Sequence, residues 1–536
     1  MKRLLLVLII VLEGMAVSKA QRPPITPAWA FSHIVWEDSL NTTTGSERLI
    51  EAYAKHNIPV DAIIIDSPWS SSYNDFQWDK QRYSNPDKMI KGFASKGIRT
   101  ILWLTGNVNM ECKDTRLQKS DAYDYVVEHN YGVNDSKPYV WWKGVGQHID
   151  FTNVKATEWW YSQLDKVFKD GVYGWKVDQG EYWLPNVFNT SLGLMSNKDF
   201  RHYYYDAMYD YTVKRKKDGI IIARPYSHQG GLEASVEKMN LGWCGDFSGD
   251  WNGLKLQIDN IYRSSQYGYG AVGCEVGGFY KEKSSNKQFL RYIQFGCMTA
   301  CIINGGENGA FSTHLPWYHG KMVNKAYTWC VNFHKELVPY MFSTVVDAHL
   351  HGGSLIKKSS IENFSHQLGN EIFTKAIVSD NDQCEVILPN EGKWIDFWTG
   401  QEYGAGEKVF RKFGEIEFPL FIRKGAIIPL SISNSITGIG NASFKGKRVF
   451  YIIPNGVESQ KIYLPINDGI DYFSCSVIMD EKTNSIHLNS EQAIDCVFIL
   501  KTEKKPKTIV GGTMLDYKNG NLYIKSAGEK IDIFMK

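Results

Sequence analysis

Gly174-Trp-Lys-Val-Asp-Gln-Gly-Glu181 is a short, mostly apolar run that ends in a carboxylate followed by a turn-forming glycine. Three further apolar runs also end in a charged residue, at Asp66, Arg224 and Asp246. Short apolar runs that stop at turn residues predict buried strands. In a barrel of parallel strands, the groups at the carboxyl ends gather on one rim, where barrel enzymes place their active sites. The four charged residues therefore predict a common site.

Outward from this stretch, residues 28–340 alternate short β-branched runs with longer amphipathic stretches, which indicates repeated βα units. The candidate strands are residues 62–66, 99–104, 174–178, 219–224, 241–246, 270–276 and 301–305. The candidate helices are residues 47–56, 86–95, 156–169, 199–217 and 251–265. No GxGxxG motif opens any of these helices, and the units outnumber those of a simple nucleotide-binding fold. The pattern predicts an α/β fold of the (β/α)8 TIM-barrel type.

After about residue 345 the sequence changes to short alternating runs separated by turn residues, such as Lys393-Trp-Ile-Asp-Phe-Trp-Thr-Gly400. This pattern is typical of all-β domains, and it breaks near residues 431–441. We therefore expect two small all-β sandwich domains after the barrel. The predicted organisation is a signal peptide (1–20), the catalytic barrel (21–344), a proximal sandwich (345–432) and a distal sandwich (433–536).

The N-terminus and the composition narrow the class of protein. Lys2 and Arg3 precede an apolar run, and Ser18-Lys-Ala20 suits cleavage, so a secreted or periplasmic protein is expected. No later stretch predicts a membrane span. Basic and acidic residues nearly cancel, 60 against 58, so we expect no nucleic-acid partner. The 9 cysteines form no CxxC pair, and we expect neither a metal nor a cofactor. Oligomeric state stays open.

Two carboxylates on one rim are what glycoside hydrolysis needs, because one attacks the anomeric carbon while the other moves a proton. Lys176 lies two residues before Asp178 and would keep that carboxylate ionised. Trp243 and Phe247 flank Asp246, and their apolar bulk would keep it protonated. Any one strand-ending carboxylate could instead cap the next helix.

Several segments form an ordered set along the chain. They are Asp150-Phe-Thr-Asn-Val-Lys-Ala-Thr-Glu-Trp-Trp160, Lys176-Val-Asp-Gln-Gly-Glu181, Ala223-Arg224, Trp243-Cys-Gly-Asp246, Val276-Gly-Gly-Phe279 and Phe418-Pro-Leu-Phe-Ile-Arg-Lys-Gly-Ala-Ile-Ile-Pro429. This set resembles the motifs of glycoside hydrolase family 31, from about Pro27 to Pro429.

The resemblance implies a role for each matched position. Asp178 corresponds to the nucleophile and Asp246 to the acid/base, with a covalent glycosyl-enzyme intermediate and retained α configuration. Asp66 corresponds to the residue that holds sugar hydroxyls, and Arg224 to an arginine that contacts the sugar. The remaining candidate substrate-binding residues are Lys176 near the nucleophile, a pocket histidine at His314, and pocket walls at Trp103, Trp175 and Trp243.

Three departures from the family pattern affect the substrate rather than the reaction. The segment from Asn304 to Trp317 differs from the commonest α-glucosidase pattern. Barrel-like sequence begins almost directly after the predicted signal peptide, without the β-sandwich that usually lends a loop to the pocket, so the pocket is either more open or closed by other loops. Glu275 stands where the family typically has aspartate, which changes the reach of a carboxylate at the rim.

The prediction is a retaining, exo-acting α-glycosidase that releases terminal sugars from oligosaccharides or glycoconjugates. α-Glucosidase, α-galactosidase and α-xylosidase specificity stay open, as does transglycosylation. A non-catalytic sugar-binding barrel is the non-enzyme alternative, but it usually loses one of the site residues. A metal-dependent barrel hydrolase would need histidines clustered at strand ends, and the 13 histidines show no such cluster on the predicted strands.

Overall fold

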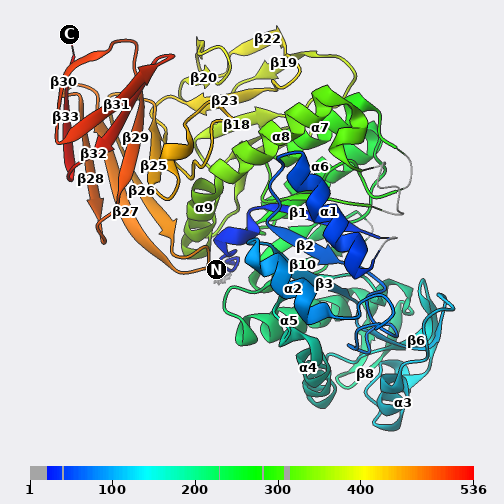
Figure 1. Ribbon diagram of the computed structural model, residues 1–536. Helices are drawn as coiled ribbons and strands as arrows, with labels where there is room; N and C mark the ends of the chain where they lie inside the picture. Colours follow the sequence, from blue (N-terminus) through cyan, green and yellow to red (C-terminus); the bar gives the residue numbers. More distant parts are fainter. Residues whose placement is uncertain (1–20, 39–40, 229, 281–282, 307–313, 536) are drawn as a thin grey trace, which may run out of the picture.

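The computed structural model describes residues 21–38, 41–228, 230–280, 283–306 and 314–535. The predicted signal peptide lies outside these residues. Eight parallel strands close into a barrel (Figure 1). In chain order they are β1 (His33–Glu37), β2 (Ala62–Ile65), β3 (Arg99–Leu104), β7 (Val172–Val177), β10 (Ile220–Ala223), β13 (Leu241–Trp243), β14 (Val272–Glu275) and β15 (Ile302–Asn304). The predicted (β/α)8 barrel is confirmed.

β1 is the barrel strand that the sequence pattern does not predict. Its five residues, His33-Ile-Val-Trp-Glu37, are all buried, and it pairs in parallel with β2 on one side and with β15 on the other. Its two terminal residues are of types that rarely lie fully buried, so the run does not read as a buried strand. The strand closes the barrel.

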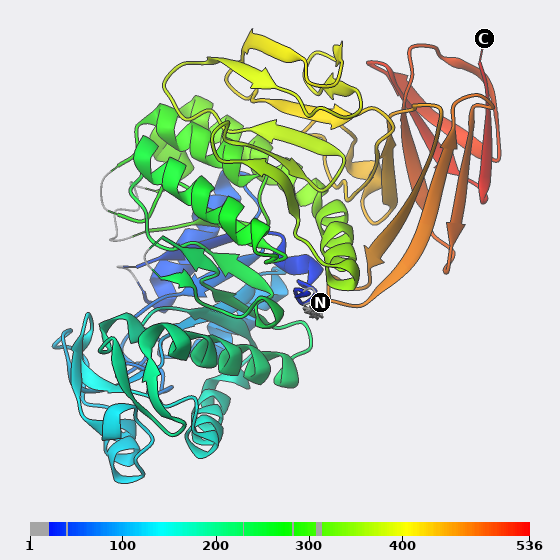
Figure 2. The same ribbon diagram turned by 180° about the vertical axis from the view of Figure 1, so that it is seen from behind.

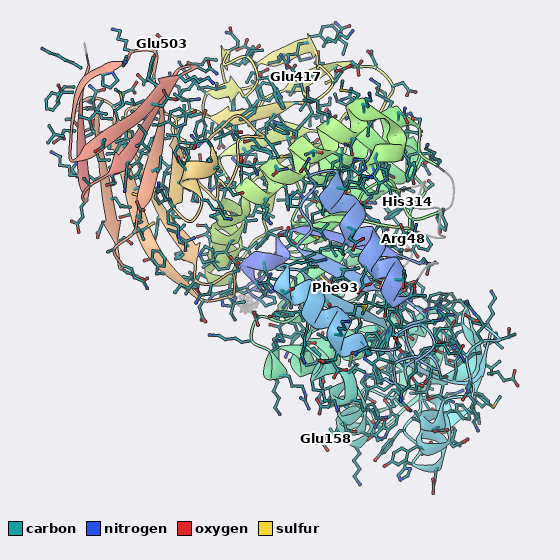
Figure 3. The ribbon with its side chains drawn as sticks, viewed as in Figure 1. Arg48, Phe93, Glu158, His314, Glu417 and Glu503 are labelled. Carbon is teal, nitrogen blue, oxygen red and sulfur yellow. The ribbon has the colours of Figure 1, made fainter. Side chains whose placement is uncertain are left out.

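The outer layer consists of helices. They are α1 (Thr43–Lys55), α2 (Pro86–Ser95), α4 (Val154–Phe168), α5 (Asn197–Arg215), α6 (Trp251–Gln266), α7 (Asn286–Gly296) and α8 (Lys321–Glu336). α2 begins as its sequence indicates, because the Asn85 side chain accepts a hydrogen bond from the Lys88 amide at 3.0 Å and Pro86 occupies the first turn. Phe93, on the same helix, is buried (Figure 3). No helix in the described ranges is long and apolar enough to span a bilayer.

Between β10 and β13 the described residues contain no α-helix. They form a short ribbon, β11 (Tyr226–Ser227) with β12 (Gly231–Leu232), and one 3-10 turn at Val236–Lys238. The barrel therefore departs from a strict strand–helix alternation at this one connection.

α7, α8 and α9 (Val338–His351) are absent from the predicted helices. α8 and α9 lie between the barrel and the C-terminal sheets in both views (Figures 1 and 2). α9 contacts β24 (Ile427–Leu430) and β26 (Val457–Pro465), and most of its residues are buried. A helix covered on both sides has no single apolar face, so the amphipathic pattern that predicts a helix is weak.

Two excursions leave the barrel at its carboxyl end. The first, between β3 and α4, contains β4 (Asn107–Cys112), α3 (Asp121–Glu128), β5 (Tyr139–Trp141) and β6 (Gly144–His148), with the sheet order β4-β6-β5. The second, between β7 and α5, is the hairpin of β8 (Val187–Thr190) and β9 (Gly193–Ser196). Both lie on the far side of the barrel from the C-terminal sheets (Figures 1 and 2).

The C-terminal part is all β, as predicted. A six-stranded sheet and a two-stranded sheet come first, and their strands are β16 (Ile356–Ser360), β17 (Ser365–Leu368), β18 (Ile372–Lys375), β19 (Gln383–Ile387), β20 (Trp394–Asp396), β21 (Glu402–Tyr403), β22 (Lys408–Lys412) and β23 (Leu420–Arg423).

Two five-stranded sheets form the distal part and enclose one apolar core. Their strands are β24, β25 (Arg448–Ile452), β26, β27 (Tyr472–Asp480), β28 (Ser485–Ser490), β29 (Cys496–Lys501), β30 (Pro506–Val510), β31 (Gly512–Lys518), β32 (Asn521–Ser526) and β33 (Lys530–Met535). The domain bounds stay a prediction: α9 runs across residue 344, and β24 joins the distal sheet before residue 432.

Candidate active site

A cavity of about 580 Å³ opens at the carboxyl end of the barrel strands. Its lining combines strand ends with residues of the first excursion and contains acids, cations and aromatic rings. The residues are Trp36, Asp38, Asp66, Ser67, Pro68, Tyr73, Lys113, Asp114, Arg116, Trp142, Lys143, Lys176, Asp178, Gln179, Trp183, Arg224, Asp246 and Phe279. All four charged strand-end residues singled out from the sequence lie in this lining.

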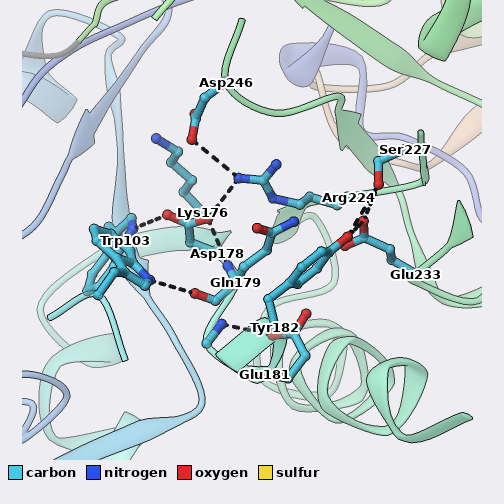
Figure 4. A network of polar contacts seen from close by, with 12 residues as sticks. Trp103, Lys176, Asp178, Gln179, Glu181, Tyr182, Arg224, Ser227, Glu233 and Asp246 are labelled. Carbon is cyan, nitrogen blue, oxygen red and sulfur yellow. Dashed lines mark hydrogen bonds and ion pairs between the residues drawn. The ribbon is translucent and has the colours of Figure 1, made fainter. Parts of the chain in front are cut away.

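Asp178 follows the last residue of β7 and is held by three donors (Figure 4). Its Oδ2 accepts a hydrogen bond from Trp103 Nε1 at 2.9 Å. Its Oδ1 accepts from Arg224 Nη2 at 3.0 Å and from the Gln179 amide at 2.8 Å. Burial opposes ionisation, but the positive charges of Arg224 and Lys176 outweigh it and lower the pKa of Asp178. The side chain is a fixed, ionised carboxylate.

Asp246 follows β13 and faces the same guanidinium. Its Oδ2 lies 3.7 Å from Arg224 Nη2, and its side chain is 35% exposed toward the pocket. Desolvation in the pocket raises the pKa of Asp246, the negative charge of Asp178 adds to this effect, and Arg224 opposes it. The two carboxylates therefore differ in the way that an acid and a nucleophile must.

Gly245 permits this arrangement. Its backbone φ is +98°, and a Cβ atom there would lie 2.1 Å from Arg224 Nη1. Any larger residue would displace the guanidinium from the two carboxylates.

Lys176 and Asp66 form a second buried ion pair. Lys176 Nζ donates to Asp66 Oδ2 at 2.9 Å, and Asp66 Oδ1 accepts from the Ser67 amide at 2.7 Å. The ammonium lies 3.7 Å from the ring centre of Trp36 and 4.7 Å from that of Trp243. Burial alone would lower the pKa of Lys176, but Asp66 and Asp178 raise it. The permanent positive charge of Lys176 therefore lies beside the carboxylates of Asp66 and Asp178.

The predicted aromatic and histidine positions divide into two groups. Trp103 and Trp243 do not line the cavity but contact residues that do. Trp103 donates to Asp178, and Trp243 packs under Arg224 with the guanidinium carbon 4.0 Å from its ring centre. Trp175 is fully buried between β7 and the helices, where it stacks on Phe168 at 5.7 Å. Its prediction as a pocket wall is therefore not supported, because successive strand residues point to opposite faces and Lys176 takes the inner one.

His314 also lies outside the cavity lining. It is 2% exposed, and its ring nitrogens find no hydrogen-bond partner among the described residues. Burial lowers its pKa to about 4, so the ring is neutral at physiological pH. A direct role in the pocket is not supported by this placement.

Sequence reasoning missed several lining residues, mainly Trp36, Tyr73, Trp142, Lys143 and Phe279. Trp36 lies on β1, the strand that was not predicted. Phe279 ends the segment Val276-Gly-Gly-Phe279, and this segment is the sequence signal for its place at the pocket. Trp142 and Lys143 lie between β5 and β6, in an excursion whose place over the pocket no local pattern reveals.

Glu275, the departure noted in the sequence, is the last residue of β14 and is fully buried below the rim. Burial raises its pKa to about 8, with Lys176 opposing and Asp246 adding to the shift. It does not line the cavity. It is a neutral carboxylic acid below the rim.

A second pair of buried acids lies behind the loop that follows Asp178 (Figure 4). Glu233 accepts hydrogen bonds from Tyr182 at 2.6 Å and from Ser227 at 2.8 Å. Glu181 accepts from the Gly180 amide at 2.8 Å, and burial raises its pKa to about 7. These contacts hold residues 179–182, and with them the backbone next to Asp178.

The geometry can support acid–base and nucleophilic chemistry on a sugar. Arg224 Nη2 lies 3.0 Å from Asp178 Oδ1 and 3.7 Å from Asp246 Oδ2. The distance between these two oxygens therefore cannot exceed the sum of the two contacts. Among the described residues, no group of three or more His, Cys, Asp or Glu side chains is arranged to hold a metal ion.

Two family models match the barrel and the part of the chain that follows it. A model of the TIM-barrel domain of glycosyl hydrolases family 31 matches residues 23–344, and one of the family's C-terminal domain matches residues 359–428. Alpha-glucosidase 2 of Bacillus thermoamyloliquefaciens is 22% identical over 434 residues, which cover 76% of this chain and 54% of that relative. Alpha-xylosidase XylQ of Lactiplantibacillus pentosus is 23% identical over 452 residues, 75% of this chain and 54% of that relative.

The chain spans about half the length of these curated relatives. Among solved structures, the cycloalternan-forming enzyme from Listeria monocytogenes has a TM-score of 0.84 at 17% identity, covering 96% of this chain and 55% of that one. That likeness shows the fold. The family model of the barrel covers more than half of the chain, and the chain therefore belongs to glycoside hydrolase family 31.

Proposed function

We propose that the protein is a retaining, exo-acting α-glycosidase in which Asp178 is the nucleophile and Asp246 the acid/base. The observation that carries the proposal is the pair of carboxylates on one arginine, with the pKa of Asp178 lowered and that of Asp246 raised. One is ready to attack and the other to donate a proton.

In the first step, Asp178 attacks the anomeric carbon while Asp246 protonates the leaving glycosidic oxygen. The C–O bond to the leaving group breaks and an ester to Asp178 forms. Trp103, Arg224 and the Gln179 amide hold the attacking carboxylate in place. Lys176 holds Asp66 toward the cavity, where its carboxylate can accept hydrogen bonds from sugar hydroxyls.

In the second step, Asp246 removes a proton from water, and the water oxygen attacks the anomeric carbon of the ester. Two inversions restore the α configuration. If a sugar hydroxyl replaces water, the same intermediate gives a transglycosylation product.

The sugar is the open part of the proposal. Two relatives are named as an α-glucosidase and an α-xylosidase, and one structural neighbour is named as a cycloalternan-forming enzyme. These names support α-linked glucose-type substrates and are compatible with transfer of the sugar to another sugar. α-Galactosides remain in the set to be tested. The substrates proposed are terminal α-linked sugars of oligosaccharides or glycoconjugates, met by a secreted or periplasmic protein.

The test is hydrolysis of 4-nitrophenyl α-glucoside, α-galactoside, α-xyloside and α-N-acetylgalactosaminide by the wild type, Asp178→Ala and Asp246→Ala. A matched control is Asp495→Ala, an exposed aspartate of the distal sandwich. One substrate should be cleaved with the α-sugar as first product in NMR, and Asp178→Ala should lose about 10⁴-fold or more of kcat. The control should match the wild type.

Azide separates the roles. With Asp178→Ala it should take the place of the nucleophile and yield a β-glycosyl azide. If Asp178→Ala keeps its activity, or the first product is the β-sugar, the assigned mechanism is wrong. If no glycoside is cleaved while the wild type binds sugars on a glycan array, the non-catalytic alternative gains.

A further inference from the structure

One wall of the cavity comes from the first excursion and carries two lysines. Lys143 lies between β5 and β6, and its backbone oxygen accepts hydrogen bonds from the Lys113 amide at 2.9 Å and from Asn109 Nδ2 at 3.1 Å. Lys113 follows β4. We call these two residues the lysine wall. Because the Lys113–Lys143 link is made by the backbone, both side chains are left to face the cavity that they line.

The ammonium of Lys143 is surrounded by aromatic rings. Its Nζ lies 4.3 Å from the ring centre of Trp142, 5.5 Å from that of Tyr73 and 5.7 Å from that of Trp103. Among the described residues, no carboxylate or carbonyl oxygen lies within hydrogen-bond or ion-pair distance of this atom. Cation–π contacts attract the ammonium but use none of its N–H donors in a hydrogen bond to an acceptor oxygen. The group therefore has donors left for a ligand.

Three other cations of the cavity differ from Lys143 in this respect. Arg224 is paired with Asp178, Lys176 with Asp66 and Arg116 with Asp114. Lys113, by contrast, forms no ion pair within the described part of the chain. The cations beside Asp178 and Asp246 are thus paired with carboxylates, while neither lysine of the lysine wall forms an ion pair within the described part of the chain.

Burial acts on Lys143 as expected for a cation without a close partner. Burial lowers the pKa of Lys143, although Asp38, Asp66, Asp178 and Asp114 all act in the opposite direction from a distance. An anion in contact with the ammonium would reverse this shift. A charge-assisted hydrogen bond is also stronger than one to a neutral hydroxyl.

The rings fix where such an anion would lie relative to the reaction. Trp103 is next to Lys143 on one side and donates to the nucleophile Asp178 on the other. The space in front of Lys143 is therefore separated by one ring from the carboxylate that attacks the anomeric carbon in the proposed mechanism. An acidic group bound there belongs to the released sugar and not to a distant part of the leaving group.

We propose that the lysine wall binds an acidic substituent, a carboxylate or an ester sulfate, on the sugar that the enzyme releases, with Lys143 as its main ligand. This proposal rests on the proposed function, since it names the substrate class of the same site. It makes the preferred substrate an α-linked acidic sugar.

The experiment compares neutral and acidic versions of one sugar. The probes are 4-nitrophenyl α-glucoside, its 6-sulfate and the α-glucuronide, with the corresponding galactose set. The variants are Lys143→Met and Lys143→Arg, with Lys137→Met as the matched control, because Lys137 is an exposed lysine of the same excursion outside the cavity. Each variant is checked for folding by its thermal unfolding.

One acidic glycoside should exceed its neutral partner in kcat/KM by about tenfold or more. Lys143→Met should remove that preference, Lys143→Arg should keep most of it, and Lys137→Met should leave it unchanged. The preference should also shrink at high salt. Equal losses on neutral and acidic glycosides would show that Lys143 binds a hydroxyl, and the proposal would be wrong.

A binding experiment separates this proposal from the proposed function. Calorimetry would measure the binding of free glucose, glucose 6-sulfate, glucuronate and their galactose counterparts. Tighter binding of an acidic sugar that is lost in Lys143→Met supports the subsite even if no glycoside is hydrolysed. Absence of any such preference overturns the subsite, whether or not neutral glycosides are cleaved.

Discussion

The carboxyl rim of the barrel and the core of the distal sandwich both bury many side chains, but these are of opposite kinds. At the rim, buried Lys176 and Arg224 are each paired with an aspartate. The distal core consists of apolar side chains such as Phe450 and Phe498, whose ring centres lie 5.5 Å apart. Buried charges cost free energy that apolar burial does not. The buried charges of the rim therefore suit a chemical role, and the apolar core of the sandwich stabilises the fold.

The sharpest way to test this contrast is to remove the acid from the rim. Asp246→Ala should lower kcat for unactivated α-glycosides by about 10²–10⁴-fold and should spare aryl glycosides with good leaving groups more. In the wild type, kcat/KM should fall as pH rises through the raised pKa of Asp246 and as pH falls through the lowered pKa of Asp178. The pH–rate profile of Asp246→Ala should lose its alkaline limb. An unchanged alkaline limb would contradict the assignment.

The reverse change breaks the sandwich and leaves the rim intact. Phe498→Ala opens a cavity in the distal core and should lower the free energy of unfolding by about 3–5 kcal/mol. Chemical denaturation measures this loss. The kcat/KM per folded molecule should equal that of the wild type, and a large fall in kcat/KM would show that the two regions are not independent.

A smaller effect is expected from one hydrogen bond at the rim. Trp103→Phe keeps an aromatic ring but removes the donor to Asp178 Oδ2. A hydrogen bond to a charged group contributes about 1.5–3 kcal/mol, so kcat should fall by about 10- to 100-fold. The acid limb of the pH–rate profile should also move to higher pH, because the carboxylate loses a stabilising donor. Trp398→Phe, which removes an indole donor in the C-terminal sheets, is the control.

Glu336 gives the smallest expected effect and concerns a buried acid without a cation. Both of its oxygens accept from Thr437 at 2.8 Å, and burial raises its pKa from 4.5 to about 8. The folded state therefore holds a proton that the unfolded chain has lost, and stability falls as pH rises through this range. Glu336→Gln should reduce that slope by at most about 1.4 kcal/mol per pH unit. An unchanged slope between pH 5 and 8 would contradict the raised pKa.

The barrel could be predicted because its strands are short buried runs that end in functional residues, as at Asp66, Asp178 and Asp246. These sequence signals are local, because each strand and the charged residue at its end can be recognised without the rest of the chain. β1 and α9 escaped prediction because their surroundings, and not their own patterns, decide their structure. A strand with polar ends and a helix covered on both sides have no periodic signature.

The site divides in the same way. Residues at strand ends were placed correctly in the cavity, since a barrel brings its strand ends together whatever their sequence separation. Trp175 lies outside the cavity because successive strand side chains point to opposite faces, and Lys176 takes the inner face. Lys143 and Trp142 could not be predicted, because their position over the pocket depends on how the whole excursion folds back.

The position of Arg224 between the two carboxylates has a consequence for the order of events in the proposed mechanism. Its Nη2 lies 3.0 Å from Asp178 and 3.7 Å from Asp246. Desolvation is the main cause of the raised pKa of Asp246, and the negative charge of Asp178 adds to it. In the proposed mechanism the first step converts Asp178 into a neutral ester, so this added repulsion disappears while the guanidinium stays. The pKa of Asp246 should then drop just when it has to accept a proton from water. One stationary charge thus switches the same side chain from acid to base between the two half-reactions, without any movement of the chain.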